Sequence, residues 1–142
     1  MMKHKNLIRL GIAVLLAGFT FSCKPDPKED PAPVDPKSRY FGSWTCNEHS
    51  KTDGTNASYT VHLVDSTGDY LLIESFYNQG FNRKAKATVS GDNMSMVVPQ
   101  NINGFFIKNF SGHMDNASTI SMSYVVNDGT ADDSCTAVLN KQ

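Results

Sequence analysis

The amino-acid sequence predicts an all-β domain, an eight-stranded antiparallel up-and-down β-barrel, on three observations. Apolar and polar residues alternate with a period of two from about residue 40 onward, which is typical of strands with one buried face. Turn pairs such as Asn103-Gly104 and Asp128-Gly129 separate these segments at short intervals. No stretch shows a convincing helical period. A meander of this kind can pair its first strand with its last, which removes both sheet edges.

The alternation places each expected strand between two turn signals. It is clearest in residues 59–63 and 120–126, where apolar side chains occupy every second position. The eight expected strands span residues 42–50, 57–66, 69–77, 83–90, 93–99, 104–114, 119–127 and 134–141.

The first 22 residues have the pattern of a secretory signal peptide. Lys3, Lys5 and Arg9 precede an apolar run at 10–21, which is shorter than the roughly 20 residues that a transmembrane helix needs. The run ends at Cys23 after a small residue, which resembles the bacterial lipobox. That resemblance implies cleavage before Cys23 and a diacylglycerol on its thiol, so that the lipid on Cys23 attaches the protein to a membrane. The alternative is an ordinary signal peptide followed by an incidental cysteine.

Residues 23–39 are expected to form a tether between the lipid and the barrel, which occupies residues 40–142. All but one of the six prolines lie in residues 24–37, among acidic residues and lysines, and such a segment favours an extended spacer. Its acidic residues resemble the surface-export signal of Bacteroides-type lipoproteins. The expected location is therefore the outer membrane of the cell envelope, facing the periplasm or the surface.

Charge and cysteine content narrow the classes of function. The net charge is −1, and the one basic cluster, at 83–86, is more typical of a solvated strand than of a phosphate site, so no nucleic-acid partner is expected. Cys46 and Cys135 lie near the two ends of the domain, and an exported protein occupies an oxidising compartment. A disulfide between them is the first expectation, with a zinc site as the less favoured alternative.

A family resemblance rests on short motifs. The Gly-Ser-Trp segment at 42–44 resembles the G-x-W motif of lipocalins and other calycins. Together with the eight-strand pattern, the Val-Pro-Gln segment at 98–100 and the Phe-Ser-Gly segment at 110–112 resemble small lipocalin-like domains of Bacteroides-type lipoproteins. The resemblance implies a barrel whose base is closed by Trp44. The C-terminal helix of true lipocalins has no counterpart here.

No catalytic motif is found, so the sequence predicts that the protein is not an enzyme and uses no cofactor. His49, His62 and His113 lack metal-ligand spacing. Glu48 and Glu74 could form a carboxylate pair only if the fold happened to bring them together.

Two binding functions stay open. The first is a lipid-anchored protein that holds a small apolar ligand in the barrel mouth. The second is a protein–protein interaction or protease-inhibitor module on a solid barrel, with Phe81 as an exposed anchor. The candidate ligand-binding residues are Trp44, Tyr59, Leu71, Ile73, Met94, Met96, Phe106, Met122 and Tyr124.

Overall fold

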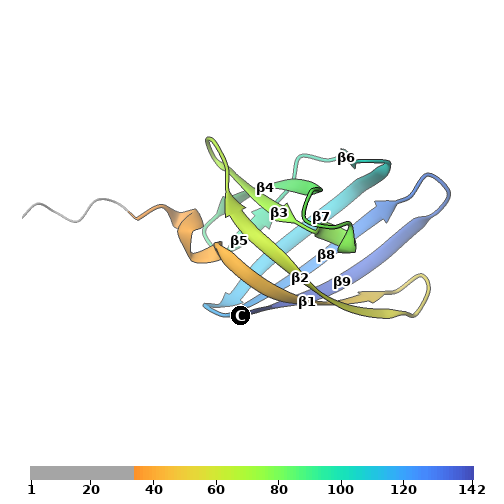
Figure 1. The fold of residues 1–142 in the computed structure, drawn as a ribbon, viewed down its shortest axis with the longest axis horizontal. Coiled ribbons are helices and arrows are strands. Elements are labelled where there is room, and N and C mark those ends of the chain that lie inside the picture. The colour runs from red at the N-terminus through yellow and green to blue at the C-terminus, as the bar shows by residue number, and fades with distance from the viewer. Residues whose placement is uncertain (1–33) are drawn as a thin grey trace, which may run out of the picture. The chain divides into compact units, whose positions relative to one another are not determined.

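The computed structural model describes residues 34–142, which form a closed, eight-stranded antiparallel β-barrel without an α-helix (Figure 1). The sheet order is β5-β4-β3-β2-β1-β9-β8-β7-β6, and a further pairing of β5 with β7 closes the barrel. The strands are β1 (Gly42–Ser50), β2 (Asn56–Asp65), β3 (Tyr70–Glu74), β4 (Lys84–Ser90), β5 (Asn93–Ser95), β6 (Gln100–Ile102), β7 (Phe105–Asn116), β8 (Thr119–Asn127) and β9 (Asp132–Lys141). Two short 3-10 helices are η1 (Pro36–Tyr40) and η2 (Phe76–Asn78).

The strands β5 and β6 are two halves of one barrel strand. Both pair with β7, with Met94 opposite Gly112 and Gln100 opposite Ile107. Residues 96–99 interrupt the strand between them, where Pro99 has no N–H to donate to a ladder. The expected strand at 93–99 is therefore shorter than predicted, but its place between β4 and β7 is as expected.

Closure of the first strand on the last is confirmed. β1 pairs with β9 in antiparallel register, and each of the other neighbours in the barrel is joined by a hairpin or short connection. Alternation puts Trp44, Cys46 and Ser50 of β1 on the inner face, where all three are buried.

The prediction of a disulfide between Cys46 and Cys135 is wrong. Cys46 lies opposite Leu139, whereas Cys135 lies opposite Ser50, and both cysteines are free and buried. Four residues of strand separate the two positions by about 13 Å, well beyond the Cα separation that a disulfide allows. The two side chains share the inner face as expected, but alternation does not determine how far β9 is shifted along β1.

We expect both barrel cysteines to be reduced and unreactive in the native protein. Burial raises the pKa of the Cys46 thiol to about 12 and also raises that of Cys135, so the reactive thiolate is scarce at neutral pH. Iodoacetamide without reductant should label the peptides that contain Cys46 and Cys135 only after denaturation, as counted by mass spectrometry. A cross-linked peptide containing both would contradict this register.

The helix η1 closes one end of the barrel, which we call the base. Trp44 is fully buried there, and its Nε1 donates a hydrogen bond to the Tyr40 carbonyl at 2.8 Å. The Tyr40 hydroxyl reaches the Gly91 carbonyl at 3.1 Å, and Lys37 donates to Asp65 at 3.0 Å. Residues 36–39, at the end of the expected tether, therefore pack on the barrel. Within residues 34–142, no helix is long and apolar enough to span a bilayer.

Phe106 does not face the barrel interior, contrary to the prediction. Its side chain is 40% exposed, and Ile107 points inward instead. An irregularity in the β7–β8 register between Ile107 and Asn109 adds a residue, so the inner face continues at Phe110 and Gly112. The bulge shifts the phase of alternation within one strand, which a uniform period of two does not anticipate.

Candidate functional site

The inward-facing side chains are fully buried at the base of the barrel, and several of them are only partly buried at the opposite end. Trp44, Cys46 and Leu63 are fully buried, whereas inward-facing Glu48 and Tyr59, nearer the other end, are only partly buried. We call this accessible end the distal mouth. Its residues are Glu48, Tyr59, Phe76, Tyr77, Phe105, Tyr124 and Asp133.

Glu48 is an inward-facing carboxylate of β1, two residues from Cys46 and two from Ser50 on the same inner face. The Tyr59 hydroxyl donates to Oε2 of Glu48 at 2.6 Å, and the Tyr124 hydroxyl donates to the same oxygen. No donor within residues 34–142 reaches the other oxygen, Oε1, and yet these residues contain no buried side-chain oxygen without a partner. Oε1 of Glu48 is therefore in contact with solvent at the mouth.

A second carboxylate, that of Asp133, lies at the rim of the mouth. It accepts hydrogen bonds from the Ser50 hydroxyl at 2.5 Å, the Tyr77 hydroxyl at 2.9 Å and the Cys135 thiol at 3.2 Å. Burial by itself would raise the pKa of Asp133, but the donors, Ser50 foremost, outweigh it and hold the pKa below its usual value. Asp133 is therefore ionised at neutral pH.

The tyrosines of the mouth are neutral hydrogen-bond donors at neutral pH. Burial is the largest cause that raises the pKa of Tyr59, Tyr77 and Tyr124, and the nearby carboxylates raise it further. Among the ion pairs of residues 34–142, none involves Glu48 or Asp133. The mouth thus combines carboxylate acceptors with phenol donors and aromatic surface.

The helix η2 carries two aromatic side chains to the mouth. The backbone of Tyr77 has a φ of 53°, in the left-handed region that non-glycine residues seldom adopt. Phe76 is buried against Tyr124, with ring centroids 4.7 Å apart, and Tyr77 packs on Phe105 at 5.8 Å. The expected strand at 69–77 therefore ends at Glu74, and the next residues line the opening.

The predicted ligand-binding residues divide by depth. Tyr59 lies partly buried at the mouth, and Tyr124, although only 3% exposed, contacts the mouth carboxylate Glu48. Several other mouth residues were not singled out as binding residues by the sequence, among them Asp133. The fully or almost fully buried core contains Trp44, Leu71, Ile73, Met94 and Met122. Met96 is partly buried where the fifth barrel strand is interrupted, and Phe106 faces outward. One feature of the sequence points to Glu48 as a site residue: it is acidic and lies in the inward-facing phase of β1.

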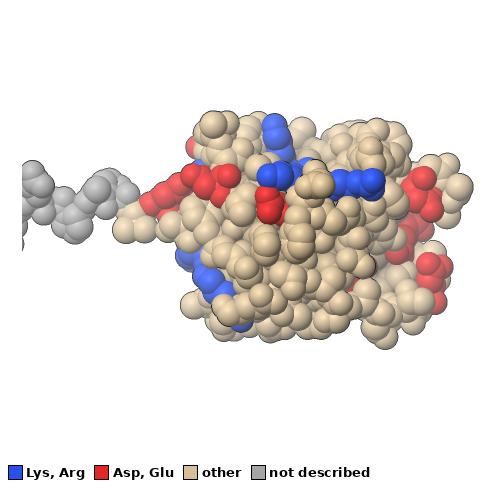
Figure 2. Space-filling model, viewed as in Figure 1, with Lys and Arg blue, Asp and Glu red and all other residues tan. Residues whose placement is uncertain are grey.

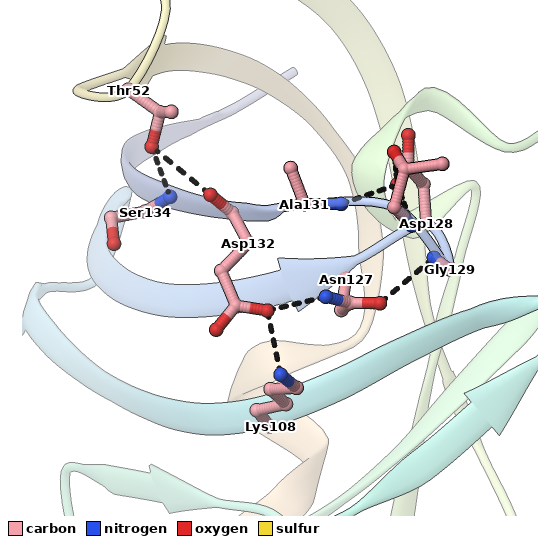
Figure 3. A network of polar contacts seen from close by, with 9 residues as sticks. Thr52, Lys108, Asn127, Asp128, Gly129, Ala131, Asp132 and Ser134 are labelled. Carbon is pink, nitrogen blue, oxygen red and sulfur yellow. Dashed lines mark hydrogen bonds and ion pairs between the residues drawn. The ribbon is translucent and has the colours of Figure 1, made fainter.

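A polar network fixes the β8–β9 turn at the same end of the barrel (Figure 3). Asp132 accepts from Lys108 at 2.6 Å and also from Asn127. The carboxylate of Asp128 accepts from the Thr130 hydroxyl at 2.6 Å, and this hydrogen bond and those from the turn backbone lower its pKa to about 2.

In the described part of the chain, no group of three or more His, Cys, Asp or Glu residues could hold a metal ion. Acidic side chains gather at this edge of the visible face (Figure 2).

Comparison with known proteins supports the fold. No protein-family model matches the chain, and no curated protein matches its sequence. The solved structure of a redesigned β-barrel is similar over 75% of this chain and 94% of its own, with 18% identity and a TM-score of 0.56. A second redesigned β-barrel, bound to DFHBI, matches over 76% of this chain and 100% of its own, with 12% identity and a TM-score of 0.43. The chain is thus an eight-stranded barrel with a lipocalin-like scaffold.

Proposed function

We propose that the protein is a lipid-anchored lipoprotein of the bacterial outer membrane whose barrel is a non-catalytic binding domain for a compact, largely apolar ligand. The observation that carries the binding role is the partial exposure of inward-facing aromatic side chains at the distal mouth, above a fully buried core. An eight-stranded barrel has little interior space beyond its side chains, so the ligand would lie in the mouth and not deep in the barrel.

The arrangement of polar groups favours binding over catalysis. His49, His62 and His113 lie on outward-facing positions of their strands, where their ring nitrogens contact Asn56, Glu74 and Asn93 respectively. Within residues 34–142, no imidazole therefore lies beside a mouth carboxylate to serve as its acid–base partner. Hydroxyls and carboxylates around an aromatic opening are the groups that orient a bound ligand.

The anchor is tested by replacing Cys23, which lies outside the described residues. Cys23→Ala is expected to move the protein from the membrane fraction to the soluble fraction, because the thiol that carries the diacylglycerol is lost. Cys46→Ala is the matched control, since it removes a cysteine of the barrel and should leave the protein on the membrane. A Cys23→Ala protein that still sediments with membranes would contradict the lipid anchor.

The mouth is tested with two neighbouring phenylalanines that face opposite ways. Phe105 packs on Tyr77 at the mouth, whereas Phe106 is exposed on the outer wall. Phe105→Lys should weaken binding of the neutral fluorescent probe N-phenyl-1-naphthylamine by roughly tenfold or more, because a charge would lie against the apolar body of the probe. Phe106→Lys should leave binding unchanged. Equal effects of the two variants would exclude the mouth as the site.

A protein–protein interaction on the outer wall is the second candidate function. Phe81 is 46% exposed and stacks on His62, with ring centroids 4.4 Å apart. A rigidly held, exposed aromatic is a typical interface anchor. Lack of saturable probe binding by the unmodified protein would favour this function over ligand binding.

A further inference from the structure

The interruption at 96–99 leaves a gap in the barrel wall that is closed by a side chain. The Lys86 N–H donates to Oε1 of Gln100 at 2.9 Å, and Nε2 of Gln100 donates to the Lys86 carbonyl at 2.6 Å. The side-chain amide of Gln100 thus makes the two hydrogen bonds to the Lys86 backbone that a paired strand residue would otherwise make. Because the wall is closed in this way, residues 96–99 can run outside the ladder.

A depression of about 280 Å³ lies on the outer wall beside this interruption. Tyr70 and Thr88 are opposite each other on β3 and β4, and Lys86 is two residues from Thr88, so their side chains share the outer face. The exposed Val97 and Pro99, two residues further along the chain, also line the depression. The depression is lined by Tyr70, Lys86, Thr88, Val97, Pro99 and Gln100.

The electrostatics of the depression are set by one lysine. Lys86 Nζ lies 5.4 Å from the centroid of the Tyr70 ring, and no carboxylate of residues 34–142 lies within ion-pair distance of it. Lys84, two residues earlier on the same strand and face, is paired with Glu74 at 2.7 Å. The depression therefore offers an ammonium group without a carboxylate partner beside aromatic and aliphatic surface.

We propose that this depression is a binding site for a small carboxylate with a planar apolar body. The carboxylate would pair with Lys86 Nζ, and the body would pack between the Tyr70 ring and the side chains of Val97 and Pro99. A single cation suits a monoanion, and the apolar walls favour a carboxylate on an aromatic body over a hydrated inorganic anion. The volume of about 280 Å³ is just below the usual range of ligand sites, which limits the ligand to a compact molecule. The site is independent of the distal mouth.

The proposal is tested with 3-phenylpropionate, 3-phenylpropanol and 3-phenylpropylamine as probes of the full-length protein. The carboxylate should bind about fivefold more tightly than the alcohol, as expected for one solvent-accessible ion pair, and the amine more weakly than the alcohol. Amide chemical shifts should change at Tyr70, Thr88 and Val97. Equal affinities for the carboxylate and the alcohol, no saturable binding, or shifts confined to the distal mouth would each overturn the proposal.

Two lysine variants separate the local ion pair from the general charge of the surface. Lys86→Gln should abolish the preference for the carboxylate over the alcohol, whereas Lys84→Gln, its matched control, should retain it. Tyr70→Ala should weaken binding of both probes to a similar degree, because it removes the apolar contact and leaves the charge. An equal loss of preference in the Lys84→Gln and Lys86→Gln variants would show that the effect comes from net charge and would overturn the assigned site.

Discussion

Replacement of Trp44 by alanine is expected to lower the free energy of unfolding by about 3–5 kcal/mol, the usual range for deleting a large buried aromatic side chain. Trp44 is fully buried at the base, where its ring packs in the core and lies beside Lys141, and its Nε1 binds the Tyr40 carbonyl. The variant loses this contact between η1 and β1 as well as the packing. Urea unfolding followed by circular dichroism measures the loss, since the variant has no tryptophan for fluorescence.

Trp44→Phe separates the two contributions at the base. It keeps most of the aromatic packing but removes the N–H donor, so we expect a loss of about 1–3 kcal/mol from the unpaired Tyr40 carbonyl and the smaller ring. If Trp44→Ala costs less than about 1 kcal/mol, which is typical of surface positions, then the base is not closed by this residue.

Gly112→Ala is expected to cost about 1–3 kcal/mol through overpacking of the core. A Cβ atom at this position would lie 2.9 Å from Cε and 3.1 Å from Cβ of Met94 on the paired strand. The end of the Met94 side chain can move, but its Cβ is attached to the backbone of β5. The added methyl group would therefore press β5 away from β7, where the barrel closes.

Met94→Ala tests the origin of this cost in a double-mutant cycle. In the Met94→Ala background the cost of Gly112→Ala should fall but not vanish, because Cε, the nearest atom, is absent whereas the Cβ at position 94, 3.1 Å from the new methyl group, remains. Ser111→Ala is the matched control on the exposed face of the same strand and should change stability by less than about 0.5 kcal/mol. A Gly112→Ala cost that is the same in both backgrounds would show that the contact with Cε of Met94 contributes nothing to it.

The placement of most strands follows from the sequence because alternation and turn residues are local signals. β1, β2, β8 and β9 lie within one or two residues of their expected bounds. The Gly-Ser-Trp segment at 42–44 correctly indicated a buried tryptophan at the base. Gln100 and the segment at 110–112 lie on the paired strands β6 and β7, whereas Val98 and Pro99 lie in the interruption between β5 and β6. The role of Gln100 in closing the wall could not be predicted, since it depends on a partner 14 residues away.

The candidate site was only partly predictable for the same reason. Tyr59 and Tyr124 were recognised as inward-facing from their strand phase, and they meet at Glu48 of β1. Tyr77 was expected in a strand, but a left-handed backbone turns η2 over the opening. Its hydroxyl donates a hydrogen bond to Asp133, 56 positions away in the sequence, and no local pattern predicts so distant a contact.

The sequence by itself determined the all-β class, the up-and-down order of strands and which side chains of most strands face inward, because these depend on period and turn chemistry within short segments. Only the tertiary structure decided the stagger between strands, the bulge in β7 and the depth of each inward residue. Stagger keeps Cys46 and Cys135 apart, and the bulge turns Phe106 outward. Both arise from how distant strands fit around one closed core, where side-chain packing and hydrogen-bond register are settled together.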